Sequence, residues 1–116
     1  MADINDMQSW ELSELIERFE KDIVSEAGRF DIGFFGSRAR IELERRGKEA
    51  LKAIVEYLRK TELRERYYLG KAWCWLLHNF EIVIDPEKSG PPCLSDLQGW
   101  YRWAEKMVQP EKDDAS

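Results

Sequence analysis

The sequence predicts an all-α protein, a compact bundle of about five helices. Apolar residues recur every three or four positions through most of the chain, which is the period of an amphipathic helix. The length of 116 residues is typical of one domain, so residues 1–116 are expected to form a single helical domain. The one strand-like stretch has no partner strand in the chain, and a lone strand is not stable. The helices are expected at about residues 9–27, 37–46, 48–60, 62–78 and 95–108.

The first expected helix, residues 9–27, has one apolar side. Ser9 is suited to cap its first turn, and Glu11 and Glu14 lie near its positive end. The apolar positions follow the helical spacing i, i+3, i+4, i+7 and i+11: Leu12, Leu15, Ile16, Phe19 and Ile23. Residues 1–8, before this helix, are expected to be a flexible terminus.

Residues 28–37, GRFDIGFFGS, are expected to be a connector. Their glycines do not match a phosphate-binding loop, because no Gly-Lys-Ser/Thr follows and no strand precedes them. Phe30, Phe34 and Phe35 are expected to cover one end of the helices. A ring that stays exposed there becomes a candidate contact for a partner.

Residues 37–60 have the most regular pattern. Ser37 is suited to cap the helix 37–46, and Gly47 allows a sharp turn into the helix 48–60, so an antiparallel hairpin is expected. The block SRARIELERRGKEALKAIVEYLRK resembles a HEAT-like repeat, in which the second helix carries the apolar positions Ala50, Ile54 and Leu58. The resemblance covers about residues 37–77. It implies a short array of helical hairpins that binds other macromolecules.

The helix 62–78 is expected to be the centre of the core. Thr61 is suited to cap it, and from Tyr67 onward it is apolar on nearly every side, as in a helix that other elements surround. The strand-like stretch FEIVID, residues 80–85, is interpreted as an extended connector with Phe80 and Val83 on the core.

The last helix, residues 95–108, begins with a capping box formed by Ser95 and Gln98. Pro110 ends it, and residues 110–116 are expected to be a flexible acidic tail. Trp100 and Trp103 have two interpretations. Each packs in the core, or one ring stays exposed and supports self-association, because tryptophan is favoured at interfaces.

Few residues can support catalysis. The one histidine, His78, lies four residues after Cys74 on the same helix face, but burial among tryptophans should raise the pKa of this thiol and silence it. The spacing of His78, Cys74 and Cys93 is not that of a zinc site. No enzyme activity, cofactor or metal is therefore expected. The lack of a long apolar run and of a signal-peptide pattern at the N-terminus predicts a cytoplasmic protein without a membrane span. In that compartment Cys74 and Cys93 are expected to be free thiols.

The charge is unevenly distributed. The chain has a net charge of −5, whereas residues 36–71 alone carry 11 basic and 6 acidic side chains. The helix 9–27 has an acidic face with Glu14, Glu17 and Asp22. The positive charges of the middle segment gather over residues 38–52: Arg38, Arg40, Arg45, Arg46, Lys48 and Lys52. These segments either complement each other on the folded surface or meet charged partners.

A non-enzymatic protein–protein interaction module or adaptor is the expected function. The candidate interaction surface consists of aromatic and basic residues: Phe34, Phe35, Arg38, Arg45, Arg46, Trp100 and Trp103. One alternative is a small acidic inhibitor, of the immunity-protein type, that binds a basic partner through the acidic helix face. A second is nucleic-acid binding through the basic 38–52 face, which is not expected because the chain is acidic overall. A monomer or a weak homodimer is expected.

Overall fold

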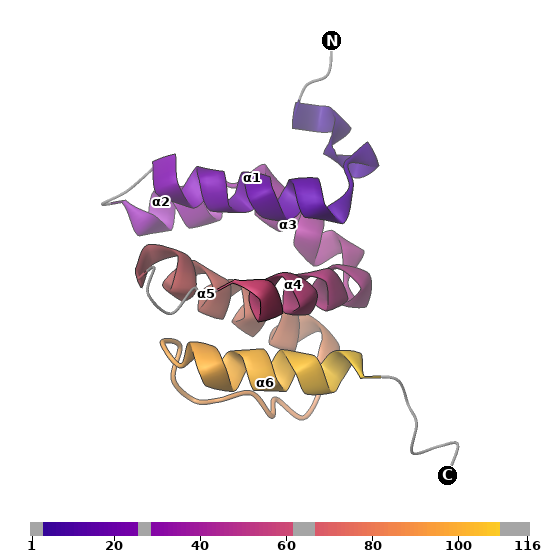
Figure 1. Cartoon of the computed structure of the whole chain (residues 1–116), viewed down its shortest axis with the longest axis vertical. Coiled ribbons are helices and arrows are strands. Elements are labelled where there is room, and N and C mark those ends of the chain that lie inside the picture. The colour runs from indigo at the N-terminus through magenta and orange to yellow at the C-terminus, as the bar shows by residue number, and fades with distance from the viewer. Residues whose placement is uncertain (1–3, 26–28, 62–66, 110–116) are drawn as a thin grey trace.

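The computed structural model describes residues 4–25, 29–61 and 67–109, and in these ranges it contains only helices and loops. The all-α prediction is confirmed (Figure 1). The chain order is the 3₁₀ helix η1 (Ile4–Ser9), then α1 (Leu12–Ser25), α2 (Phe30–Phe35), α3 (Arg38–Arg46), α4 (Lys48–Lys60), α5 (Tyr67–Ile84) and α6 (Leu97–Val108).

Helix α5 is the central element, as the sequence predicts. It packs against each of the other α-helices, with α1, α2 and α3 on one side and α6 on the other (Figure 1). Its buried side chains include Trp73, Leu76, Leu77 and Phe80. This wide apolar surface explains the position, because a helix that is apolar on several sides must be covered on several sides. The expected start of this helix at residue 62 lies outside the described residues.

The extended connector expected at residues 80–85 is wrong. Helix α5 continues through this stretch to Ile84, and the amide of Asp85 still donates a hydrogen bond to the carbonyl of Glu81 (3.0 Å). Phe80 packs in the core, but Val83, also expected there, is 71% exposed. Branched residues lower helix propensity by only a few tenths of a kcal/mol, so the packing of Phe80 outweighs the local preference.

The expected connector at residues 28–37 contains the short helix α2. Phe34 is buried, and its ring meets Phe19 of α1 and Trp75 of α5 edge to face, with centroid distances of 6.1 Å and 5.6 Å. Phe34 therefore covers one end of the helices as expected, whereas the side chain of Phe30 lies outside the described residues. Phe35 points outward and is 59% exposed.

Two of the predicted local signals on either side of α3 are confirmed. The hydroxyl of Ser37 accepts a hydrogen bond from the amide of Arg40 (3.2 Å) and caps α3. Gly47, between α3 and α4, has a φ of +64°, which residues other than glycine rarely adopt.

Two predicted caps are shifted, and a third cannot be compared at its helix start. Helix α1 begins at Leu12, after η1 has ended at Ser9. Thr61 lies at the end of α4, where its hydroxyl donates to the carbonyl of Tyr57 (3.1 Å). Its predicted cap of a helix from residue 62 concerns residues outside the described ranges. At α6 the cap is Asp96 rather than Ser95, since its carboxylate accepts from the amide of Gly99 (2.9 Å).

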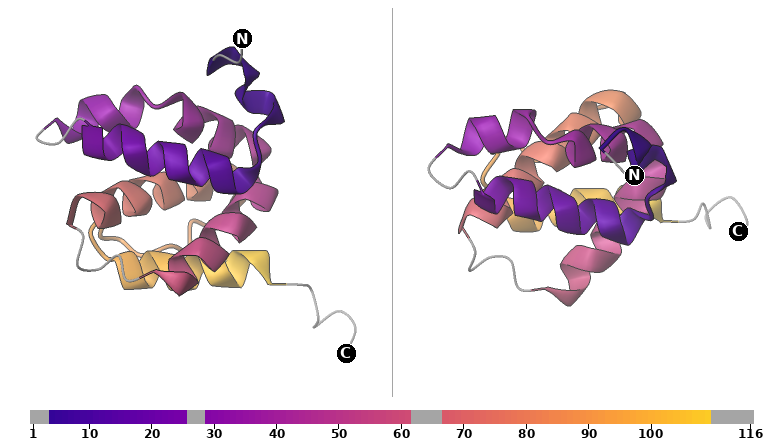
Figure 2. Two further views of the ribbon diagram at one scale, coloured as in Figure 1. Left: turned by 45° about the horizontal axis from the view of Figure 1, so that its top comes forward. Right: turned by 90° about the horizontal axis from the view of Figure 1, so that it is seen from above.

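Helices α3 and α4 diverge from the Gly47 turn. The most extensive packing of α3 is with α1, and that of α4 is with α6. Figure 2 shows α4 leaving α3 at an angle and approaching α6. The divergence leaves room between α1 and α4. Membership of the HEAT-like repeats stays a prediction.

Candidate functional site

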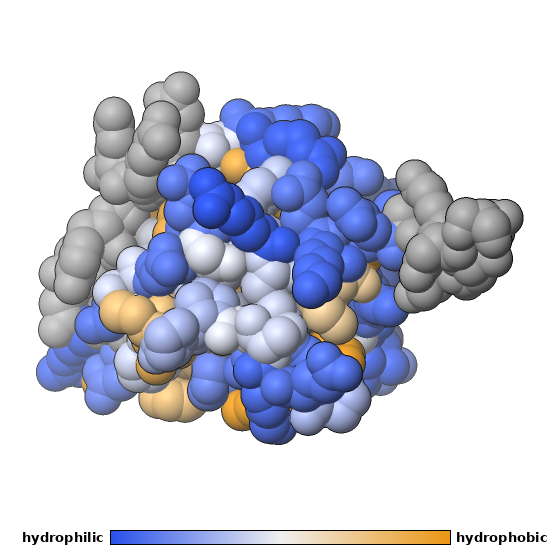
Figure 3. Space-filling view, turned by 90° about the horizontal axis from the view of Figure 1, so that it is seen from below, coloured by the Kyte–Doolittle hydropathy of each residue, from blue (hydrophilic) through white to orange (hydrophobic). Residues whose placement is uncertain are grey.

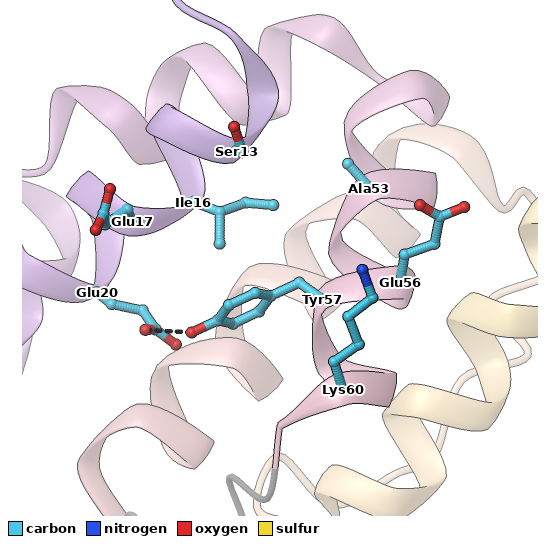
Figure 4. Close-up of a pocket in the computed structure, with 8 residues that line it drawn as sticks. All are labelled: Ser13, Ile16, Glu17, Glu20, Ala53, Glu56, Tyr57 and Lys60. Carbon is cyan, nitrogen blue, oxygen red and sulfur yellow. Dashed lines mark hydrogen bonds between the residues drawn. The ribbon is translucent and has the colours of Figure 1, made fainter.

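A groove of about 450 Å³ lies between α1 and α4 (Figure 4). Helix α1 contributes one side and α4 the other. The residues that line it are Ser13, Ile16, Glu17, Glu20, Ala53, Glu56, Tyr57 and Lys60. Carboxylates are the commonest polar group among them, and Ile16, Ala53 and the Tyr57 ring supply apolar surface between them.

One wall of the groove is held by a carboxylate that receives two hydrogen bonds. The Tyr57 hydroxyl donates to Glu20 Oε1 (2.5 Å), and Trp73 Nε1 donates to Glu20 Oε2 (2.9 Å). Trp73 is fully buried, and its ring centroid lies 5.8 Å from that of Tyr57. Glu20 and Tyr57 are therefore fixed by the core.

The groove carries more negative than positive charge. Three glutamates line it, against the single ammonium of Lys60. Within the described part of the chain, neither Glu17 nor Glu56 forms an ion pair. In Figure 4 these two side chains lie at opposite sides of the groove, and the Lys60 amine lies between Tyr57 and Glu56. Charges of one sign beside an apolar wall strengthen the local field, so this groove attracts cations.

The acidic face predicted for α1 is only partly available. Glu17 lines the groove, but Asp22 accepts hydrogen bonds from Arg18 Nε (3.0 Å) and from the Ser37 hydroxyl (2.7 Å). Glu20 was not predicted as a site residue. The one feature of the sequence that indicates Glu20 is its spacing of four from Ile16, which places it at the edge of the apolar stripe of this helix.

Three of the four aromatic residues in the predicted interaction surface are in the core. Phe34, Trp100 and Trp103 are buried, and Phe35 alone is exposed. The face of the molecule that carries α6 is mainly hydrophilic as a result, with small separate apolar areas (Figure 3). The buried tryptophans have polar partners: Trp100 Nε1 donates to the carbonyl of Cys93 (3.0 Å). These three rings are therefore not at the surface of the folded protein.

The predicted basic residues differ in availability. Arg38 is exposed. Arg45 and Arg46 both donate to the buried carboxylate of Glu42, each through Nε at 2.9 Å. Hydrogen bonds from Arg45, and then from Arg46, hold the pKa of Glu42 below its usual value, although burial opposes them. Arg46 also donates to the carbonyls of Met7 and Gln8 and so attaches η1 to α3. Much of the basic segment is therefore neutralised within the chain.

Two further buried carboxylates, Glu81 and Asp85, anchor the loop after α5. Asp85 accepts from Trp103 Nε1 (2.8 Å) and from both the hydroxyl (2.7 Å) and the amide (2.9 Å) of Ser89. These bonds, that from Trp103 first, hold the pKa of Asp85 well below its ordinary range. Glu81 accepts from the amide of Gly90 (2.7 Å). Their hydrogen bonds position the loop on the helices, so we assign them a structural role.

The cysteines and the histidine form no reactive pair among the described residues. Cys74 is buried, and this burial raises its pKa to about 12, so the thiol stays protonated at neutral pH. His78 Nε2 lies 4.0 Å from Glu81 Oε1. Across the described ranges, no three or more His, Cys, Asp or Glu side chains are grouped to hold a metal ion.

Two further findings concern the chain as a whole. No helix within residues 4–25, 29–61 and 67–109 combines the length and apolar character needed to cross a membrane. No protein family, curated protein or solved structure matches this chain.

Proposed function

We propose that this protein is a non-catalytic binding module whose α1/α4 groove receives a basic segment of a partner protein. The observation that carries the proposal is the arrangement of Glu17, Glu20 and Glu56 around an apolar groove that contains one lysine. The proposal combines the expected interaction module with the alternative of an acidic inhibitor, and it assigns the contact to the groove.

The groove suits lysine and arginine side chains in two ways. Its apolar residues, Ile16 and Ala53, can cover the methylene groups of a long basic side chain while the charged end meets a carboxylate. The face of the Tyr57 ring adds a cation–π contact, worth about 0.5–1 kcal/mol at an exposed site. The negative field also accelerates the encounter with a basic partner.

A protein partner is favoured over nucleic acid. The net charge is −5, and Arg45 and Arg46 of the basic segment are paired with Glu42. A phosphate backbone would be repelled by the overall charge and would compete with these internal pairs. Free Cys74 and Cys93 thiols favour a reducing compartment, so a cytoplasmic location is part of the proposal.

Binding of labelled peptides tests the proposal. A fluorescent peptide of alternating Lys/Arg and Gly/Ser is titrated with the full chain, and its anisotropy is measured at low salt and at about 0.15 M salt. A peptide with glutamate in place of the basic residues serves as the negative control. We expect the basic peptide alone to bind, with affinity that falls as salt rises.

Matched charge variants distinguish binding in the groove from a general effect of the net charge on peptide affinity. Glu17→Gln/Glu56→Gln removes two groove carboxylates, whereas Asp31→Asn/Glu49→Gln removes two exposed acids outside the groove. Both pairs change the net charge by +2. We expect about ten-fold weaker binding for the groove pair, from about 0.7 kcal/mol for each exposed ion pair, and less than a two-fold change for the control. Equal weakening by both pairs would contradict the proposal.

Lys60 provides a test in the opposite direction. Its ammonium occupies the groove and competes with an incoming cation. Lys60→Gln is therefore expected to bind the basic peptide several-fold more tightly than the wild type. A weaker or unchanged affinity would show that the groove does not receive the positive charge.

A further inference from the structure

We infer that the solvent-facing side of α5 is a self-association surface, on which two copies of this chain pair their α5 helices antiparallel about a two-fold axis. This surface is separate from the groove, because the residues that line the groove come from α1 and α4 and none of them belongs to α5. The inference therefore goes beyond the proposed function and does not depend on it.

The spacing of the outward-facing residues is the first observation. Lys71, Trp75, His78 and Ile82 follow one another at intervals of four, three and four. This is the alternation of the a and d positions along a coiled-coil seam. None of the four is buried, whereas the opposite side of α5 forms the core. The helix thus has a second stripe, with the geometry by which one helix packs against another.

Exposed apolar area gathers along this stripe. Ile82 is 54% exposed and Val83, beside it, is 71% exposed. At the other end of the stripe, the exposed ring of Phe35 lies with its centroid 6.1 Å from that of Trp75. Large apolar side chains that are exposed together, rather than singly, are characteristic of an interaction surface.

The charges at the two ends of this stripe favour pairing with a second copy in the antiparallel orientation. Lys71 lies near the N-terminal end of α5, and the exposed Glu87 follows its C-terminal end. An antiparallel pair centred near His78 places Trp75 opposite Ile82 of the other copy. The same register brings the Lys71 ammonium to the negative C-terminal end of the second α5 and to its Glu87. A parallel pair would instead place the two Lys71 ammonium groups together.

The two-fold symmetry also pairs the apolar flanks. A two-fold axis perpendicular to both helices keeps the α3 side of one copy beside the α3 side of the other. Both side chains are on this α3 side: Arg40 of α3 lies over the Phe35 ring, and Val83 lies one helical turn after Asn79, which donates to Glu44 of α3 (2.7 Å). Because Phe35 and Val83 are at opposite ends of the stripe, Phe35 of each copy faces Val83 of the other. The most exposed apolar side chains of this region are thereby covered.

Sedimentation equilibrium of the full chain over a wide concentration range tests the surface. The weight-average mass is expected to rise from 13.7 kDa toward twice that value as concentration increases. Ile82→Glu and Val83→Glu, both at exposed positions, are each expected to weaken dimerisation at least ten-fold. Val24→Glu, at a 57% exposed position on α1, is the matched control and is expected to dimerise like the wild type.

Charge reversal tests the orientation. Lys71→Glu alone and Glu87→Lys alone are each expected to weaken the dimer, and the combined variant is expected to restore it. A wild type that stays monomeric at all concentrations would overturn the inference. So would a dimer that Ile82→Glu and Val83→Glu leave intact, or a double reversal weaker than either single one.

Discussion

Replacement of Glu42 by glutamine removes the charge to which two arginines of α3 are bound. The Glu42 carboxylate is buried and accepts hydrogen bonds from Arg45 and Arg46. The same Arg46 donates to the carbonyls of Met7 and Gln8 at 3.0 Å, so the carboxylate orients the guanidinium that holds η1 on α3. The perturbation should therefore weaken both the helix and the contact with η1.

The magnitude follows from the exposure of the two pairs. The Arg45 side chain is 59% exposed, so solvent screens its ion pair with Glu42 and this pair contributes little to stability. The side chains of Arg46 and Glu42 are only 15% and 9% exposed, and a hydrogen bond to a charged group in such surroundings contributes about 1.5–3 kcal/mol. Glutamine keeps one acceptor oxygen and retains part of this energy. We expect Glu42→Gln to lower the free energy of unfolding by about 2 kcal/mol at pH 7.

Urea unfolding followed by tryptophan fluorescence measures the change. Because the folded-state pKa of Glu42 is lowered, the stabilisation is complete above the usual carboxyl pKa and is lost as pH falls through the folded value. The difference between the wild type and Glu42→Gln should therefore be full at pH 7 and shrink below about pH 4. Glu49→Gln, at an exposed position of α4, changes the net charge equally and should alter stability by less than about 0.5 kcal/mol.

Two results would refute this reasoning. One is a loss of less than about 0.5 kcal/mol in Glu42→Gln at pH 7, which would mean that the buried pair adds nothing beyond an ordinary surface substitution. The other is a loss of the expected size that stays constant from pH 7 to about pH 3, because the charge of Glu42 would then have no part in it.

The remaining predictions concern two glycines and the two thiols. Gly47→Ala has open space for its Cβ but must keep a φ of +64°, so we expect a loss of about 1–3 kcal/mol in urea unfolding. Gly90→Ala places its Cβ 2.5 Å from the Trp100 ring, and overpacking should cost about 1–3 kcal/mol, with a changed tryptophan spectrum. Cys93 is exposed, and a hydrogen bond with the Ser95 hydroxyl lowers its pKa, so it should react with an alkylating reagent in the folded protein. The buried Cys74 should react only after unfolding. Mass spectrometry of digests distinguishes the two thiols, and early labelling of Cys74 would be inconsistent with its burial.

Features that depend on neighbouring residues in the sequence were predicted well. Ser37 and Gly47 act within one helical turn of their own positions, so their roles as cap and turn follow from residue type and local spacing. The central position of α5 was also predicted, because an apolar surface on several sides needs several partners.

The failed predictions share a physical origin in packing across the chain. Helix α5 continues through residues 80–84 because Phe80 has a place in the core, which the branched residues around it did not indicate. For Trp100 and Trp103 the sequence left two interpretations open, and in the structure both rings are buried. Trp103 donates its indole hydrogen to Asp85, and Trp100 donates its indole hydrogen to the carbonyl of Cys93. A sequence pattern does not specify such partners.

In the candidate site, too, some features follow from the sequence and others depend on packing between helices. The acidic character of the first helix and its net charge were determined by the sequence alone, since charge follows from composition. Only the tertiary structure placed Glu20 on Tyr57 and Trp73, engaged Asp22 with Ser37, and separated α1 from α4 widely enough to leave a groove.

The sequence by itself determined the helical class and the apolar stripe of each helix, because both arise from residue type at a repeating spacing of three or four. The tertiary structure decided which charges remain available to a partner. That choice depends on which side chains meet across helices, and a carboxylate or guanidinium satisfied within the chain, such as Asp22 or Arg46, offers less to a ligand than one left at the surface, such as Glu17.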